Sequence, residues 1–315
     1  MLFLPCQVKI LDMDSKQNSE QNFKNIKFES FFADIYKERW PQIFESLKKP
    51  VKHILRNNNF IQNDITLGSN SRCEFLLNTN WSDGTSHTLK NGLNINYFYK
   101  MDPASLIVAQ ALKIQENEVV LDMCAAPGGK SLVLAEGLKS TGELISNELS
   151  NDRRERLIRV FQEYIPKDLR TNIFVKGLDG NKYGLHKPEY FDAILCDVPC
   201  SGERHLLENL AEYTLWTERR SQNLAVRQYS LLSSAWLACK KQGRIVYSTC
   251  SLSPYENDQV IKKIKKRRDV QIVRDEQLKQ YPFIEETEYG YQILPDTLNN
   301  VFSFGPMYFS IMLKI

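Results

Sequence analysis

The sequence predicts an α/β fold: a doubly wound, mostly parallel sheet preceded by a smaller N-terminal α+β region. Three observations carry this prediction. From residue 102 onward, short apolar runs of strand length alternate with helical patterns, which favours a parallel sheet with helices on both faces. A glycine-rich turn, Asp122–Ser131, joins the first of these strands to a helix. Chemically active side chains follow several strand ends, and ligands of such sheets bind beyond the carboxyl ends of the strands.

Two domains are expected, 1–101 and 102–315. In the first, apolar residues at helical spacing predict helices within 28–36 and 43–47, and alternating residues predict a strand at 93–99. Asp102–Pro103 then provides a capping carboxylate and a proline at the first helical position, so a helix is expected to run to about Leu112. The remaining predicted strands are 118–123, 143–147, 172–176, 191–197, 243–249 and 307–313, and the helices are 130–139, 151–163, 217–239 and 254–267.

Composition excludes several classes of protein. Seven scattered cysteines do not suggest a disulfide framework, and neither they nor the four histidines show metal-ligand spacing. No apolar run approaches the ~20 residues of a membrane span. A net charge of +3 does not by itself indicate nucleic-acid binding. We expect a monomer without metal. The N-terminus shows no secretory or transit signal, which favours the cytoplasm, with the mitochondrial matrix as the alternative.

The glycine-rich turn indicates a bound cofactor. Glycines let a backbone approach a ligand closely, and a helix start offers unpaired N–H groups. A phosphate loop would need glycine where Cys124 stands, and the spacing of a dinucleotide fingerprint is absent. The cofactor that remains has a ribose but no phosphate chain, such as S-adenosylmethionine. A tight turn without a ligand is the alternative.

Polar residues after the second and third strands suit the same cofactor. Glu148 is placed to accept hydrogen bonds from a ribose, or else to cap the next helix. Arg153 is placed to pair with Glu148, or else to face solvent. Asp179–Gly180 is placed on the adenine side, or else forms an ordinary turn.

Two cysteines, each in a short loop after a strand, suggest covalent chemistry. Cys250 ends Tyr247–Cys250, and Cys200 ends Asp197–Cys200. A thiolate that adds to carbon 6 of cytosine makes carbon 5 nucleophilic enough to accept a methyl group. A helix expected from about Pro254 would favour that thiolate at position 250, and Asp197 would hydrogen-bond the edge of the base. Buried packing cysteines are the alternative. His205 also suggests a Cys–His hydrolase, but no orienting partner accompanies it.

These segments, in this order, resemble the Sun-type (Nop/Sun, RsmB-like) RNA cytosine-5 methyltransferases over residues 28–315. The short members that act on mitochondrial ribosomal RNA look most similar. The resemblance implies a seven-stranded, Rossmann-like sheet of the class I S-adenosylmethionine-dependent type. It also implies that Cys250 is the nucleophile and that Cys200 serves release. The implied cofactor-site residues are Cys124, Ala125, Ala126, Pro127, Gly128, Gly129, Lys130, Glu148, Arg153, Asp179, Gly180 and Asp197.

The resemblance further implies an RNA substrate, ribosomal RNA or alternatively tRNA, with RNA contact in the N-terminal region. No RNA-binding domain is appended, and short relatives can use a separate helper protein. The basic residues of 262–268 form the densest basic cluster and are a candidate for phosphate contact, with the solvated face of an amphipathic helix as the alternative. Two rivals stay open: a nucleotide-hydrolysing protein, and a non-catalytic RNA-binding or ribosome-assembly factor.

Overall fold

The computed structural model describes residues 25–62, 65, 72–84, 89–139, 141–297 and 303–315, so the first 24 residues of the predicted N-terminal region lie outside it. The helices are α1 (Ile26–Tyr36), α2 (Trp40–Lys48), α3 (Pro103–Ala111), α4 (Gly129–Leu138), α5 (Asn151–Tyr164), α6 (Tyr183–His186), α7 (Glu203–Glu208), α8 (Leu210–Thr214), α9 (Glu218–Ala238) and α10 (Asp258–Lys265). The strands are β1 (Ile54–Asn57), β2 (Thr79–Trp81), β3 (Phe98–Met101), β4 (Val119–Asp122), β5 (Glu143–Asn147), β6 (Ile173–Lys176), β7 (Phe191–Asp197), β8 (Cys239–Thr249), β9 (Val270–Ile272), β10 (Glu285–Glu286), β11 (Tyr291–Ile293) and β12 (Met307–Lys314).

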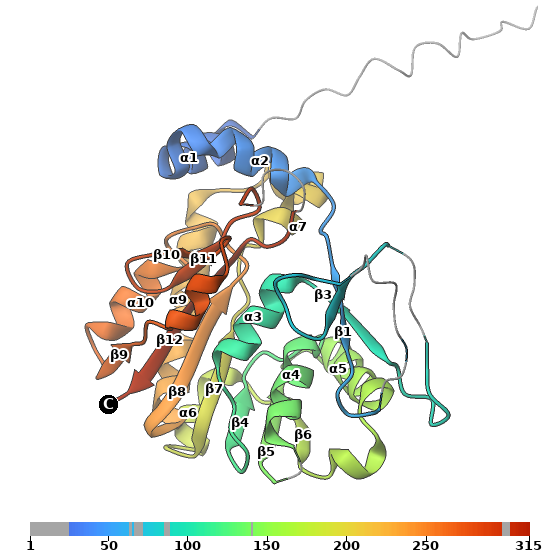
Figure 1. Ribbon diagram of the computed structural model, residues 1–315. Coiled ribbons are helices and arrows are strands. Elements are labelled where there is room, and N and C mark those ends of the chain that lie inside the picture. The colour runs from blue at the N-terminus through green and yellow to red at the C-terminus, as the bar shows by residue number, and fades with distance from the viewer. Residues whose placement is uncertain (1–24, 63–64, 66–71, 85–88, 140, 298–302) are drawn as a thin grey trace, which may run out of the picture.

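The large sheet is parallel at its centre (Figure 1). Strands β6, β5, β4, β7 and β8 lie side by side in parallel, and β12 pairs antiparallel with β8. Strand β9 pairs with one end of β12 and β11 with the other, and β10 follows β11. Within the described residues, the large sheet therefore has nine strands. The strands from β6 to β9 along this sheet number seven, as the resemblance implies. Six of these seven were predicted by range, whereas β9 and the short pair β10–β11 were not.

Alternate residues of the strands pack under different helices, which confirms the doubly wound architecture. On one face, Ala193 and Leu195 of β7 pack with side chains of α3, α4 and α5. On the other face, Ile194 and Cys196 pack with side chains of α6, α9 and α10. Cys196 is fully buried, as the sequence predicts for a core residue. Because helices cover both faces, the ends of the strands are left to form a site.

The N-terminal region lies against the carboxyl edge of the large sheet. Figure 1 shows α1 and α2 beyond the ends of β7 and β8. Their buried aromatic residues, Phe28, Phe32 and Trp40, form one hydrophobic cluster with Trp216 and Leu252. These aromatic side chains are core, so they do not provide a base-stacking platform.

A separate three-stranded antiparallel sheet, ordered β2-β1-β3, lies beside α4 and α5. The buried Arg56 of β1 holds it to α4 through a 2.6 Å contact with Glu136. The strand predicted at 93–99 is wrong for its first part, because β3 begins only at Phe98. Asn94 has a positive φ of 62°, and the side chain of Asn91 accepts hydrogen bonds from two following amides, so a turn replaces the strand.

The helix expected from about Pro254 begins instead at Asp258. The preceding residues form a turn held by the side chain of Asn257, which bonds both Thr249 (2.6 Å) and the carbonyl of Ser251 (2.8 Å). The helix N-terminus therefore does not directly follow Cys250, and the expected dipole contribution to its thiolate loses its basis. Within the described residues, no helix combines the length and apolarity needed to cross a membrane.

Candidate active site

The glycine-rich turn is shaped by contacts that exclude side chains. Gly128 has a φ of +119°, and a Cβ there would lie 3.0 Å from Leu157. A Cβ on Gly129 would lie 2.6 Å from the ring of Tyr99. Glycine is therefore required at both positions, by backbone conformation at the first and by the close approach of β3 at the second.

A cavity of about 340 Å³ lies on one side of the turn and brings together five of the twelve predicted cofactor residues. Cys124, Glu148, Asp179 and Gly180 line it from the segments that follow β4, β5 and β6, and Arg153 lines it from α5. This convergence is what parallel strands impose, because their carboxyl ends meet at one edge. Gly180 and Leu231 both line this cavity and pack closely, because a Cβ on Gly180 would lie 2.7 Å from the Leu231 side chain.

Glu148 has two carboxyl oxygens in different environments. It is buried; one carboxyl oxygen, Oε1, accepts from the Ser150 amide (2.9 Å), and Oε2 has no hydrogen bond. Arg153 lies 3.3 Å from Oε2 as an ion pair and also donates to the Ala126 carbonyl (2.9 Å). Arg153 therefore ties the second strand end to the glycine-rich turn, and Oε2 is left as a buried acceptor without a hydrogen bond. Asp179 caps a 3-10 turn by accepting a hydrogen bond from the amide of Asn181 (3.0 Å), so Asp179 also has the turn role that the sequence offered as the alternative.

A second cavity, of about 200 Å³, lies on the other side of the turn. Its lining includes Tyr99, Lys130, Asp122 and Asp197, and Cys124 lines both cavities. Lys130 and Asp197 form an ion pair of 2.9 Å, and Ser248 donates to the other Asp197 oxygen at 2.6 Å. The carboxylate of Asp197 is thus fixed between β7 and β8.

The electrostatics of this cavity favour a charged lysine. Burial opposes the charge, but Asp197, then Asp122 and Cys250, raise the pKa of Lys130 above its ordinary value. Burial raises the pKa of Asp122 to about 7, although the Ser131 hydroxyl bonds it at 2.6 Å. The sequence assigned Lys130 only to the cofactor turn. Its pairing with Asp197 joins residues 67 positions apart, and only the structure reveals it.

The two cysteines meet at the ends of β7 and β8. Their sulfur atoms lie 3.0 Å apart, and the Cys250 amide points at Cys200 Sγ (3.3 Å). Cys250 is exposed and Cys200 is half-buried. The hydrogen bond that the Cys200 thiol donates to Cys250, together with burial, raises the pKa of Cys200 well above its ordinary value. Cys200 is therefore a thiol at neutral pH, beside a more accessible sulfur.

A buried polar network holds the two cysteine loops, which we define as residues 198–202 and 250–257. Glu203 accepts from the Leu252 amide (2.8 Å), and Glu256 accepts from the Ser201 amide (3.0 Å). The Ser251 hydroxyl contacts both carboxyl groups at 3.2 Å. Neither Glu203 nor Glu256 was predicted as a site residue from the sequence. The sequence offered one clue to these two residues: Glu203 closely follows Cys200, and Glu256 closely follows Cys250.

His205 lies apart from this chemistry. Its side chain is 87% exposed and contacts Glu208 at 3.3 Å. The described residues also contain no group of three or more His, Cys, Asp or Glu side chains placed to hold a metal ion.

Solved structures share this fold at low sequence identity. NSun6 from Pyrococcus horikoshii, solved with SFG, superposes with a TM-score of 0.72 at 17% identity, over 92% of this chain and 98% of that one. A methyltransferase homolog from the same organism gives 0.73 at 22% identity, over 90% and 95%. SFG is an analogue of S-adenosylmethionine. Together with the sheet topology, these neighbours define the class I S-adenosylmethionine-dependent methyltransferase fold.

Sequence comparison narrows the class to a family. Residues 109–304 match the family model described as 16S rRNA methyltransferase RsmB/F, and the chain belongs to this family. The bovine (Bos taurus) 5-cytosine rRNA methyltransferase NSUN4 is 36% identical over 241 residues, 71% of this chain and 61% of that protein. The zebrafish (Danio rerio) mitochondrial tRNA (cytosine(34)-C(5))-methyltransferase is 34% identical, over 69% and 55%. The chain thus spans about three fifths of the length of the curated relatives it matches.

Proposed function

We propose that this chain transfers a methyl group from S-adenosylmethionine to carbon 5 of a cytosine in RNA. One observation carries the proposal: two cysteine sulfurs 3.0 Å apart lie at the same sheet edge as the Asp197–Lys130 pair and the glycine-rich turn. A packing role for both cysteines does not explain why Cys250 is exposed. The catalytic domain is proposed to be 102–315, with 1–101 as the region of RNA contact.

The cavity of about 340 Å³ fits the adenosine part of the cofactor. Glu148 would hold the ribose through its unbonded Oε2, with Arg153 fixing that carboxylate, and Asp179 would face the adenine. The turn from Cys124 to Lys130 would cradle the rest of the molecule, because Cys124 borders both cavities. When bound, S-adenosylmethionine supplies an electrophilic methyl group.

Cys250 and the Asp197–Lys130 pair would activate the base. As the bond from Cys250 Sγ to carbon 6 forms, the electrons of the 5,6 double bond move toward carbon 5 and the ring nitrogen. The carboxylate of Asp197 would accept a hydrogen bond from the cytosine amino group. The Lys130 ammonium would stabilise the negative charge that develops on the ring, a contribution that Asp197 alone cannot make.

Cys200 would serve release of the product. After carbon 5 has gained the methyl group, its proton leaves to solvent, the 5,6 double bond re-forms, and the bond from carbon 6 to Cys250 breaks. The departing Cys250 sulfur carries negative charge, and the Cys200 thiol is placed to donate a hydrogen bond to it. Its raised pKa keeps that proton on Cys200.

Two substitutions test these roles with RNA from cells that lack the gene. Cys250→Ala should abolish methyl transfer while cofactor affinity stays within a few-fold. Cys200→Ala should trap a covalent RNA–protein complex, seen as a denaturation-resistant gel shift. Cys239→Ala, at the opposite end of β8, is the matched control and should do neither. Methylation by Cys250→Ala would remove it as the nucleophile, and the absence of an adduct with a verified substrate would remove the release role of Cys200.

Ribosomal RNA is the proposed substrate, because relatives of 36% identity are named 5-cytosine rRNA methyltransferases. tRNA is the second candidate, favoured by relatives named as mitochondrial tRNA methyltransferases. The compartment printed in those names agrees with the mitochondrial alternative, and the comparisons give the cytoplasmic expectation no support. A helper protein and a monomeric state stay predictions. Bisulfite sequencing of total RNA with and without the gene would identify the modified cytosine.

A further inference from the structure

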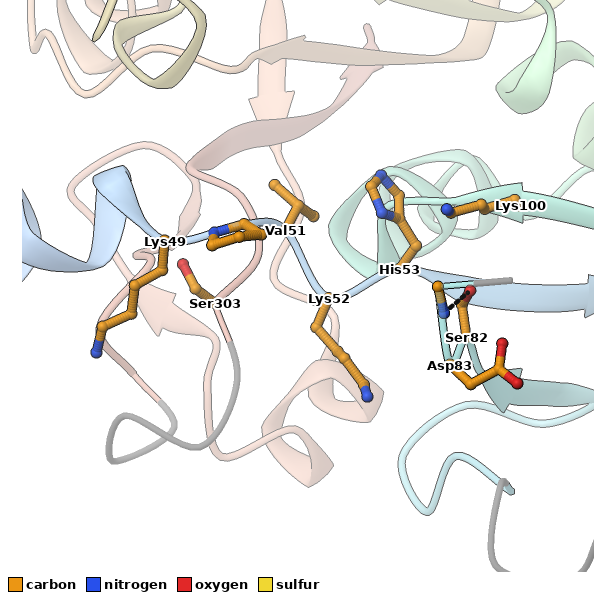
Figure 2. Close-up of a pocket in the computed structure, with 10 residues that line it drawn as sticks. Lys49, Val51, Lys52, His53, Ser82, Asp83, Lys100 and Ser303 are labelled. Carbon is orange, nitrogen blue, oxygen red and sulfur yellow. Dashed lines mark hydrogen bonds between the residues drawn. The ribbon is translucent and has the colours of Figure 1, made fainter. Parts of the chain in front are cut away.

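A basic groove of about 310 Å³ lies beside the linker that joins α2 to β1 (Figure 2). Lys49, Lys52 and His53 come from the linker, Lys100 from β3, and Asp83 from the loop after β2. Figure 2 shows Lys49 and Lys52 extending to the same side of the linker and Lys100 ending near the His53 ring. Three lysines and an imidazole thus face the groove, against Asp83 as the carboxylate among its lining residues.

This groove shares two lining residues with the candidate active site. His53 and Lys100 line both the groove and the cavity of about 200 Å³ that holds Lys130 and Asp197. A nucleotide strand whose base enters that cavity must carry its phosphates out across the rim, and the groove offers positive charge there. The pKa of His53 is lowered by burial and by the charge of Lys100, although Asp102 opposes this.

Backbone hydrogen bonds fix the groove in shape. The Lys52 amide donates to the Ser303 carbonyl (2.8 Å), and the Ser82 amide donates to the His53 carbonyl (2.9 Å). Arg204, four residues after Cys200, donates to the carbonyls of Lys49 (2.7 Å) and Gly305 (2.7 Å). The linker is therefore attached to the helix that follows the first cysteine loop, so its lysines keep a set position relative to the reacting sulfurs.

A second basic cluster, at the C-terminal end of α10 and just beyond it, lacks these connections; it is called the α10 cluster below. Lys262, Lys263, Lys266 and Arg267 line a separate hollow that includes no residue of the glycine-rich turn or the cysteine loops. Lys263 lies 4.2 Å from the ring of Tyr229, so part of this charge covers the surface of α9. The α10 cluster thus supplies a matched control for the groove.

We propose that the groove binds the phosphates of single-stranded RNA next to the target nucleotide. The proposal rests on the proposed function for the direction of the strand, but RNA affinity can be measured without any methyl transfer. Electrostatic contacts to single strands lower the slope of log K against log salt by about 0.7 for each phosphate neutralised.

The test compares two double variants of the full chain, Lys49→Ala/Lys52→Ala in the groove and Lys262→Ala/Lys266→Ala on α10. The probe is a fluorescein-labelled, 20-nucleotide, mixed-sequence single-stranded RNA, followed by anisotropy from about 50 to 200 mM salt. The groove variant should lose roughly tenfold in affinity and about 1.4 in salt slope, whereas the α10 variant should stay within twofold. Lys49→Arg/Lys52→Arg should restore both values, because it keeps the charge.

Cofactor affinity, measured in parallel, reports whether each variant is folded, since neither pair lines the cavity of about 340 Å³. Unchanged RNA affinity in the groove variant, equal losses in both variants, or no binding of the probe by the wild-type chain would overturn the proposal. If the groove variant behaves as expected but Cys200→Ala yields no adduct and no RNA is methylated, the proposed function fails and the RNA groove stands.

Discussion

The cysteine loops and the lysine-lined groove are neighbours, but different kinds of interaction build them. In the loops, buried carboxyl groups and hydroxyls are paired with one another and with backbone amides. In the groove, exposed or half-buried cations line an open surface held by backbone hydrogen bonds and by the Arg204 side chain. Buried networks fix atoms for chemistry, whereas exposed charges attract a polyanion with little loss of solvation. Substitutions in the first region should therefore change turnover, and those in the second should change RNA affinity.

Among the substitutions that separate these two regions, Asp197→Asn should show the largest effect. It removes the charge that pairs with Lys130 and weakens stabilisation of the activated base, so kcat should fall by roughly 10²- to 10³-fold. RNA affinity should change little, because the groove is untouched. Asp192→Asn is the matched control, as Asp192 lies at the other end of β7 and pairs with Lys240 at 2.7 Å. Single-turnover methylation measures the rate of methyl transfer for both variants. A loss of rate below about fivefold for Asp197→Asn would contradict its proposed role.

Glu203→Gln should act mainly through stability and its dependence on pH. Burial, then the charge of Glu256, raises the pKa of Glu203 to about 7 from an ordinary 4.5. Between these values the unfolded chain releases its proton and the folded chain keeps it, so this group lowers the free energy of unfolding as pH rises from 4.5 to 7. The variant lacks that loss. The free energy of unfolding of Glu203→Gln, taken relative to wild type, should therefore rise by on the order of 1–3 kcal/mol between pH 5 and pH 8.

Denaturant unfolding at a series of pH values measures this difference. Glu208→Gln lies on the same helix, α7, with an exposed side chain, and should show no such trend. A flat difference between Glu203→Gln and wild type would mean that the carboxyl group is ionised in the folded chain at neutral pH.

Arg153→Gln should have a smaller effect, confined to the cofactor cavity. Arg153 holds Glu148 at 3.3 Å and the turn carbonyl of Ala126 at 2.9 Å, but its side chain is 47% exposed. Its loss should weaken cofactor binding by about three- to tenfold, as expected for a solvent-screened pair. Calorimetric titration with S-adenosylmethionine measures it, with Arg156→Gln, an exposed position on the same helix, as control. Unchanged affinity would show that Glu148 needs no partner.

Much of this molecule was predictable because its signals are local. The strand ends, the glycine-rich turn and the two cysteine positions each lie within a few consecutive residues, and parallel pairing then brings them to one edge. The contacts that complete the site are not local. Lys130 meets Asp197, and Glu203 meets the loop after Cys250, only because β4, β7 and β8 are neighbours in the sheet.

The wrong predictions also have local causes that hydrophobic periodicity does not show. At 93–99, side-chain hydrogen bonds of Asn91 override the alternating pattern. After Pro254, the polar side chains of Glu256 and Asn257 are used to fix the loop, which delays the start of α10. Strands β10 and β11 have two and three residues, too few for a periodic signal.

His205→Ala should have the smallest effect, and it sharpens the contrast between buried and exposed groups. His205 is close in sequence to Cys200, but its side chain is 87% exposed and pairs with Glu208 on the surface of α7. A surface pair of this kind contributes about 0–1 kcal/mol, so stability should change by less than about 1 kcal/mol. Turnover should stay within twofold from pH 6 to 8, because no proton transfer passes through this ring. A tenfold loss that follows imidazole titration would instead support Cys–His chemistry, and would require His205 to turn inward toward a sulfur.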